Sequence, residues 1–128
     1  MLSFFDEAEL KYKISILLQL ESETKARLRP AMMNLGLDLR ENPASRQMGL
    51  DMAASMKGKS WNEIMEIIIS AVEPAINRYK EIVENSPAEY SQLTEYMLSH
   101  ESSMLEFAKL ELAGESEKAD ELISAQLI

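Results

Sequence analysis

Apolar residues recur every three or four positions over three long stretches of the chain, the spacing that gathers side chains on one face of an α-helix. The clearest stretch covers residues 61–84, and its uncharged face comprises Trp61, Ile64, Ile68, Ala71, Ala75, Tyr79 and Ile82. Charged residues occupy the opposite face, so we expect a long amphipathic helix that is central to the core. Because the apolar pattern continues in phase on both sides of Pro74, we expect a bend there rather than a break.

The other two long stretches predict one helix near each end of the chain. The first runs from Ser3 to about Leu28, before Arg29 and Pro30, and its apolar face comprises Leu10, Ile14, Leu17, Leu18 and Leu28. The last runs from Ser86 to Gly114, and its apolar face comprises Tyr90, Leu93, Met97, Met104, Leu105, Ala108 and Leu112. No segment alternates with period two over enough residues to predict a strand. The pattern therefore predicts an all-α fold, a single-domain, up-down bundle of four to five helices over residues 1–128.

Capping signals place the helix boundaries. Residues 36–42 are expected to form a connection, and Asn42 followed by Pro43 begins a short helix over residues 43–58. Two capping boxes of the form Ser-x-x-Glu, at residues 60–63 and 86–89, are expected to begin the third and fourth helices. Gly114 is expected to end the fourth helix, and a last short helix begins at residue 116.

The amino-acid composition excludes several classes of function. The 128 residues fit one ordinary domain. With no cysteine, the chain has no disulfide, thiol nucleophile or iron–sulfur cluster. His100 is its sole histidine, which excludes a two-histidine zinc motif, and no glycine-rich phosphate loop is present.

The charge is strongly acidic and uneven. The net charge is −9, and residues 86–128 carry nine acidic side chains against two lysines. Because nucleic-acid binding depends on cationic side chains, we expect no nucleic-acid partner, and for the same reason no binding to an anionic membrane surface. No apolar run is long enough for a membrane span and no signal peptide is recognisable, so we expect a cytoplasmic protein.

Three polar residues interrupt the apolar faces. On ideal helices Glu21 lies at the middle of the first apolar face, Glu101 lies at the middle of the last one, and His100 lies beside Glu101. A lone buried carboxylate is unfavourable unless it is paired or neutralised. Glu21, His100 and Glu101 could therefore converge as catalytic acid–base groups or as ligands of a single metal ion. Alternatively, they form ordinary salt bridges with nearby lysine and arginine side chains.

A ligand pocket could lie beside these three residues. Candidate lining residues are Met97 and Met104, with Tyr79 and Tyr90 supplying hydroxyl groups. Methionine is common in core positions as well as in adaptable binding surfaces, so packing alone also accounts for the two methionines.

Three stretches of the sequence resemble parts of the opening and closing helices of small ferritin-like helical-bundle proteins of unassigned function. They are Leu18–Thr24 (LQLESET) and the two runs Leu98–Glu101 (LSHE) and Glu106–Gly114 (EFAKLELAG). The resemblance implies a ferritin-like bundle whose carboxylate and histidine side chains project inward. Di-iron members use two Glu-x-x-His pairs, whereas here Met97 stands three residues before His100 and no second histidine exists. A di-iron centre is therefore not expected, although a single metal ion is compatible.

Two kinds of function remain open. The first is a non-enzymatic bundle that acts by self-association and by binding a protein partner or a small apolar ligand. The second is a small enzyme or metal-binding protein that uses the Glu/His group. A homodimer is expected because Phe4, Phe5, Ile16 and Leu20 extend beyond the central apolar face of the first helix.

Overall fold

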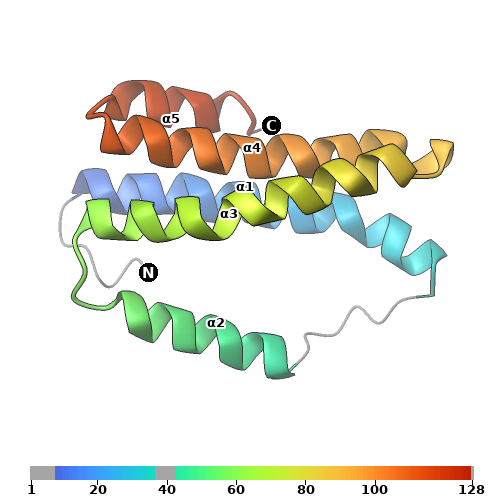
Figure 1. Cartoon of the computed structure of the whole chain (residues 1–128), viewed down its shortest axis with the longest axis horizontal. Helices are drawn as coiled ribbons and strands as arrows, with labels where there is room; N and C mark the ends of the chain where they lie inside the picture. The colour runs from blue at the N-terminus through green and yellow to red at the C-terminus, as the bar shows by residue number, and fades with distance from the viewer. Residues whose placement is uncertain (1–7, 37–42, 128) are drawn as a thin grey trace.

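The computed structural model of the chain describes residues 8–36 and 43–127, apart from the side chains of Ser45 and Met52. These residues form five α-helices and one 3₁₀ helix, without a strand, so the predicted all-α bundle is confirmed. In chain order they are α1 (Ala8–Asn34), α2 (Pro43–Met56), α3 (Trp61–Asn85), η2 (Ala88–Tyr90), α4 (Ser91–Leu112) and α5 (Ser116–Ser124). Figure 1 shows α1, α3 and α4 running along the bundle, α5 lying against α4, and α2 standing apart. The connection predicted at residues 36–42 lies almost wholly outside the described residues.

The cap at Ser60 is confirmed. The Ser60 hydroxyl oxygen accepts a hydrogen bond from the Glu63 backbone N–H (3.1 Å), and the hydroxyl donates to the Glu63 carboxylate (3.1 Å). The end of α4 is also as predicted: Gly114 adopts φ +79°, and the N–H of Glu115 donates to the carbonyl of Leu110 (2.9 Å). This arrangement satisfies carbonyl groups that the helix end would otherwise leave unpaired.

Two predicted boundaries are wrong. Ser86 does not cap α4, because it closes α3 instead: its N–H donates to the carbonyl of Val83, and the 3₁₀ turn η2 comes before α4 begins at Ser91. The first helix does not stop at Leu28 but continues through Pro30 to Asn34. Leu28, Ala31 and Met32 are partly buried there, and this packing offsets the one backbone donor that Pro30 removes.

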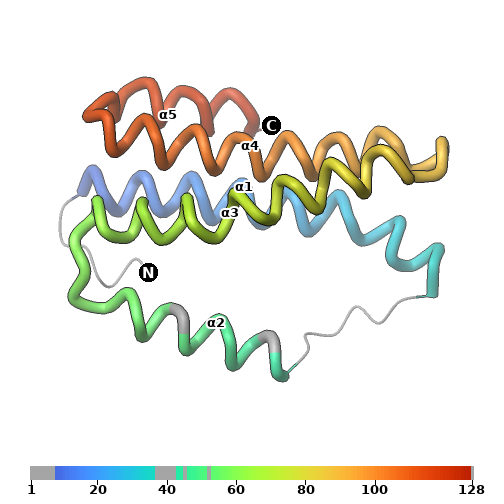
Figure 2. Tube along the Cα trace, in the orientation of Figure 1, coloured from blue at the N-terminus to red at the C-terminus, as the bar shows by residue number. Residues whose placement is uncertain are grey.

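The central helix of the bundle is α4 rather than α3, contrary to the expectation from the pattern. Helix α4 contacts α1, α3 and α5, whereas α2 stands apart from α3 along much of its length (Figure 1). Ile82, expected in the core, is 45% exposed, because it lies near the end of α3 from which α1 diverges. Helix α3 changes direction near its middle, where Pro74 lies, as expected for a proline inside a helix (Figure 2).

The buried face of α1 is rotated from the predicted one. Leu18 is 49% exposed, whereas Ile16 and Leu20 are buried at 5% and 0%. The reason is that α1 packs against both α4 and α5, so its buried face is centred nearer Leu20 than Leu18. Ile16 and Leu20 therefore offer no surface for a dimer, and Phe4 and Phe5 lie outside the described residues.

Candidate functional site

The structure brings together Glu21 of α1 and His100 of α4. The Nε2 atom of His100 lies 2.9 Å from Oε1 of Glu21, and its Nδ1 atom lies 3.0 Å from Oγ1 of Thr24. His100 is buried (3% exposed), whereas the Glu21 side chain is about half exposed (49%). Glu21 is therefore at the edge of the buried face of α1 rather than at its middle, a consequence of the rotation described above.

Hydrogen-bond geometry indicates which atoms carry protons. The Thr24 hydroxyl donates to the carbonyl of Leu20 (2.9 Å), so its oxygen is free to accept a bond from Nδ1–H of His100. A carboxylate only accepts hydrogen bonds, so Nε2 also donates when it bonds Glu21. The two bonds tie α1 to α4 through the buried ring of His100.

Glu101 and Tyr79 lie close enough to Glu21 and His100 for the charges of this pair to affect their pKa values. The hydrogen bond from His100 lowers the pKa of Glu21, although burial acts in the opposite direction. Burial raises the pKa of Glu101 and of Tyr79, and the neighbouring Glu101 charge raises that of Tyr79 further. Within the described residues no hydrogen bond joins Glu101 to Glu21 or His100. The predicted group is thus formed in part, with Glu21 and His100 in contact and Glu101 beside them.

Opposite pKa shifts predict opposite effects of two matched substitutions. Glu101 has a raised pKa in the folded protein, so its contribution to stability is present below the ordinary value of 4.5 and is lost as pH rises through the folded value. Glu101→Gln should therefore make the protein more stable at pH 7 than the wild type, by less than about 1 kcal/mol since the side chain is partly solvated. The difference should disappear on acidification, as measured by urea unfolding at several pH values.

Glu21→Gln is the control for this experiment. Glu21 has a lowered folded pKa, so its contribution is present above 4.5 and is lost as pH falls through the folded value. This variant should be less stable than the wild type at pH 7, and the two should converge in acid. Equal effects of both substitutions on stability at pH 7 would contradict the opposite pKa shifts of Glu101 and Glu21.

The cluster does not have the geometry of a nucleophilic triad. In a hydrolase triad the hydroxyl faces the substrate and the carboxylate is buried, whereas here Thr24 is buried and Glu21 is the exposed member. Both nitrogens of His100 are occupied by Thr24 and Glu21. Across residues 8–36 and 43–127, no three side chains of the histidine, aspartate or glutamate type are placed to share a metal ion.

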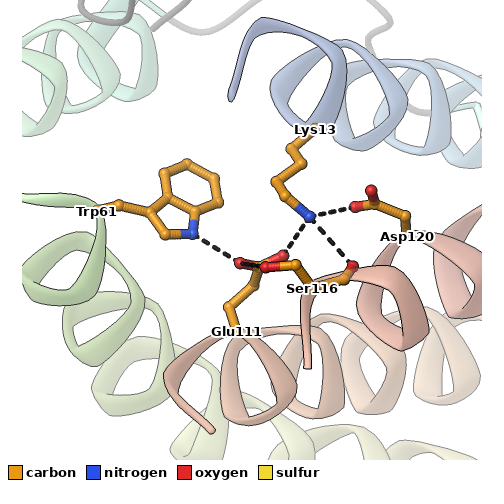
Figure 3. A network of polar contacts seen from close by, with 5 residues as sticks. All are labelled: Lys13, Trp61, Glu111, Ser116 and Asp120. Atoms are coloured by element: carbon orange, nitrogen blue, oxygen red, sulfur yellow. Dashed lines mark hydrogen bonds and ion pairs between the residues drawn. The ribbon is translucent and has the colours of Figure 1, made fainter. Parts of the chain in front are cut away.

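A second polar cluster, centred on Lys13, lies among the core residues (Figure 3). The Lys13 ammonium, 1% exposed, lies 2.5 Å from a carboxylate oxygen of Glu111 and 2.5 Å from one of Asp120, and it donates to the carbonyl of Ser116 (3.2 Å). The other oxygen of Glu111 accepts bonds from the Trp61 indole (3.0 Å) and the Ser116 hydroxyl (3.2 Å). We call these five residues the Lys13 cluster. It links α1, α3, α4 and the short α5.

The Lys13 cluster was not found from the sequence. The available signal was that Lys13 lies next to Ile14 within the apolar face of α1, just as Glu111 lies next to Leu112 in α4. The two carboxylates together raise the pKa of Lys13 although burial alone would lower it, which keeps the lysine charged. The ammonium group of Lys13 thus has three acceptors within the protein, in Glu111, Asp120 and Ser116. The Lys13 cluster therefore holds the helices together.

An apolar groove lies at the opposite end of the bundle, where α1 diverges from α3 and α4 (Figure 1). Its volume is about 410 Å³. The lining residues are Leu28, Ala31, Met32, Leu35, Ile82, Asn85, Ser86, Pro87, Tyr90, Leu93 and Thr94. We call it the α1/α3/α4 groove.

One of the four residues expected to line a ligand pocket, Tyr90, lines this groove. Met104 packs against the core instead, and Met97 and Tyr79 are partly buried outside the groove lining. The groove was not predicted as such, because it depends on the angle between helices rather than on the pattern within any one of them.

Comparison of the chain with models of protein families, with curated proteins and with solved structures gave no match. None of the described helices has the length and the apolar composition needed to cross a lipid bilayer.

Proposed function

We propose that this protein is a binding protein whose functional surface is the α1/α3/α4 groove, which takes up an apolar group. The observation that carries the proposal is the groove itself, an open, mostly aliphatic concavity of about 410 Å³. Ligand sites in proteins are typically concave, predominantly apolar and about 300–1,000 Å³ in volume. Leu35 and Ile82 are 59% and 45% exposed, so a ligand in the groove would remove apolar surface from water.

The polar side chains of the groove also favour an apolar occupant. The Asn85 amide donates to the carbonyl of Glu81 (2.8 Å), the Ser86 hydroxyl to that of Pro87 (3.3 Å), and the Thr94 hydroxyl to that of Ser91 (3.1 Å). The hydroxyl protons of Ser86 and Thr94 and one amide proton of Asn85 are thus used within the protein. An occupant therefore needs no hydrogen-bonding groups of its own to match them.

Filling the groove should abolish binding of an apolar probe. The probe is N-phenyl-1-naphthylamine, an uncharged dye whose fluorescence rises in apolar surroundings. Ala31 is a partly buried lining residue, so Ala31→Trp places an indole where the probe would lie. We expect its dissociation constant to rise at least about tenfold, as for the loss of about 1.4 kcal/mol of binding free energy.

Ala26→Trp is the matched control, because Ala26 is an exposed residue of the same helix outside the groove lining. It should leave probe binding unchanged. Equal binding by the wild type and Ala31→Trp, with circular dichroism showing both to be folded, would exclude the groove as the binding surface.

A further inference from the structure

A second concavity, more polar than the groove, lies between α1 and α4. Its volume is about 610 Å³, within the usual range of small-molecule sites. The lining residues are Arg27 of α1 and, from α4, Gln92, Leu93, Glu95, Tyr96 and Ser99. We call it the Arg27 pocket. It shares only Leu93 with the lining of the α1/α3/α4 groove.

The guanidinium group of Arg27 is held in place but has no anionic partner. Its carbon Cζ lies 4.1 Å from the centre of the Tyr96 ring, and this stacking fixes the guanidinium while leaving its N–H donors available. Among the residues that the structure describes, none forms a hydrogen bond or an ion pair with Arg27. Arg27 is therefore placed to bind a carboxylate through two parallel hydrogen bonds.

Glu95 lines the same pocket and is not paired with Arg27. Within residues 8–36 and 43–127 its carboxylate forms no hydrogen bond and no ion pair. Each of the two opposite charges is thus available to the opposite charge of a ligand. A ligand with a single charge would be attracted by one of them and repelled by the other, whereas a zwitterion matches both.

The uncharged polar side chains of the pocket are also without partners. In the part of the chain that the structure describes, neither Gln92 nor Ser99 forms a side-chain hydrogen bond. The hydroxyl group of Tyr96 is buried and has no partner there either, which is unfavourable for a hydrogen-bond donor. The Arg27 pocket therefore differs from the groove, whose polar side chains donate to backbone carbonyls, and it favours a polar ligand.

We infer that the Arg27 pocket binds a free aliphatic α-amino acid. The carboxylate of the ligand binds the guanidinium of Arg27, and its ammonium group, one carbon away, donates to the carboxylate of Glu95. The aliphatic side chain of the ligand lies against Leu93, the one aliphatic residue of the lining. This site goes beyond the proposed function, which concerns the groove.

Three ligands that differ only in charge test the recognition of both groups. L-Leucine carries both charges, L-leucinamide lacks the carboxylate, and 4-methylpentanoate lacks the ammonium group. We expect the wild type to bind L-leucine with a dissociation constant of about 1 mM or below, and each analogue at least about tenfold more weakly. Nuclear magnetic resonance titration measures these constants, and shifts of the backbone amide signals from Gln92 to Ser99 locate the site.

Two substitutions assign each ligand charge to one residue. Arg27→Gln should bind L-leucine no more tightly than L-leucinamide, because nothing then recognises the carboxylate. Glu95→Gln should bind L-leucine no more tightly than 4-methylpentanoate, because the partner of the ammonium group is lost. Arg29→Gln and Glu106→Gln change the net charge in the same way at exposed positions of the same helices outside the pocket lining. These two controls should bind L-leucine as the wild type does.

Three results would each overturn the inference. The first is a wild type whose α4 signals do not respond to L-leucine, and the second is an analogue that binds as tightly as L-leucine. The third is a control substitution that weakens binding as much as the matched substitution in the pocket. Binding of N-phenyl-1-naphthylamine in the groove, and its loss in Ala31→Trp, does not depend on Arg27 or Glu95, so the proposed function is tested separately.

Discussion

Replacing Lys13 with methionine should lower the free energy of unfolding by about 3–5 kcal/mol, the usual effect of removing one partner from a buried ion pair. Methionine fills much of the volume of the lysine stem but leaves the Glu111 carboxylate, 2% exposed at its side chain, without its cation. Asp120 loses its partner as well. Since α5 has only nine residues, we expect its attachment to α1 to weaken most. Urea denaturation followed by circular dichroism measures the change.

Two further variants show whether the effect comes from the buried charge. Lys118→Met removes the exposed pair between Lys118 and Glu115 (3.3 Å) and should change stability by no more than about 1 kcal/mol. Adding Glu111→Gln to Lys13→Met should recover part of the lost stability, because glutamine removes the uncompensated charge and still accepts the bond from Trp61. A Lys13→Met protein as stable as Lys118→Met would show that the Lys13 cluster does not hold the bundle together.

The helices could be predicted because the physical causes of their ends are local. Ser60 and Glu63 are three residues apart and satisfy each other wherever the helix lies, and Gly114 takes a positive φ without steric cost. The extension of α1 through Pro30 was missed because it depends on packing of Ala31 and Met32 against other helices. Ser86 does not cap α4 for a different and local reason, because it ends the preceding helix α3 instead.

The contact between Glu21 and His100 could be inferred because both interrupt an apolar face, and a buried polar group needs a partner. Their alignment across two helices, and the absence of a bond from Glu101, depend on the relative rotation of α1 and α4. Periodicity does not determine that rotation, as the exposure of Leu18 shows. The α1/α3/α4 groove could not be predicted from the sequence pattern, because it exists only where three helices diverge.

Phe107→Ala should lower the free energy of unfolding by about 3–5 kcal/mol, the range for removing a buried aromatic side chain. Phe107 is fully buried, its ring meets the Trp61 ring edge-on with centroids 6.5 Å apart, and the Lys13 ammonium lies 5.9 Å from its centre. Its loss leaves a cavity against the Lys13 cluster and removes the aromatic contact of Trp61. Because Trp61 is the sole tryptophan of the chain, its fluorescence reports this change directly during unfolding.

Tyr12→Ala is the control, since Tyr12 is 51% exposed on α1 and its loss should cost less than about 1 kcal/mol. Phe107→Leu should fall between the two, because leucine fills part of the cavity. If Phe107→Ala were no more destabilising than Tyr12→Ala, the packing of α3 and α4 around Phe107 could not be the main source of stability at this end of the bundle. The Lys13 cluster would then hold α5, α4 and α1 together through its polar bonds alone. In that case Lys13→Met should prevent folding rather than only lower the free energy of unfolding.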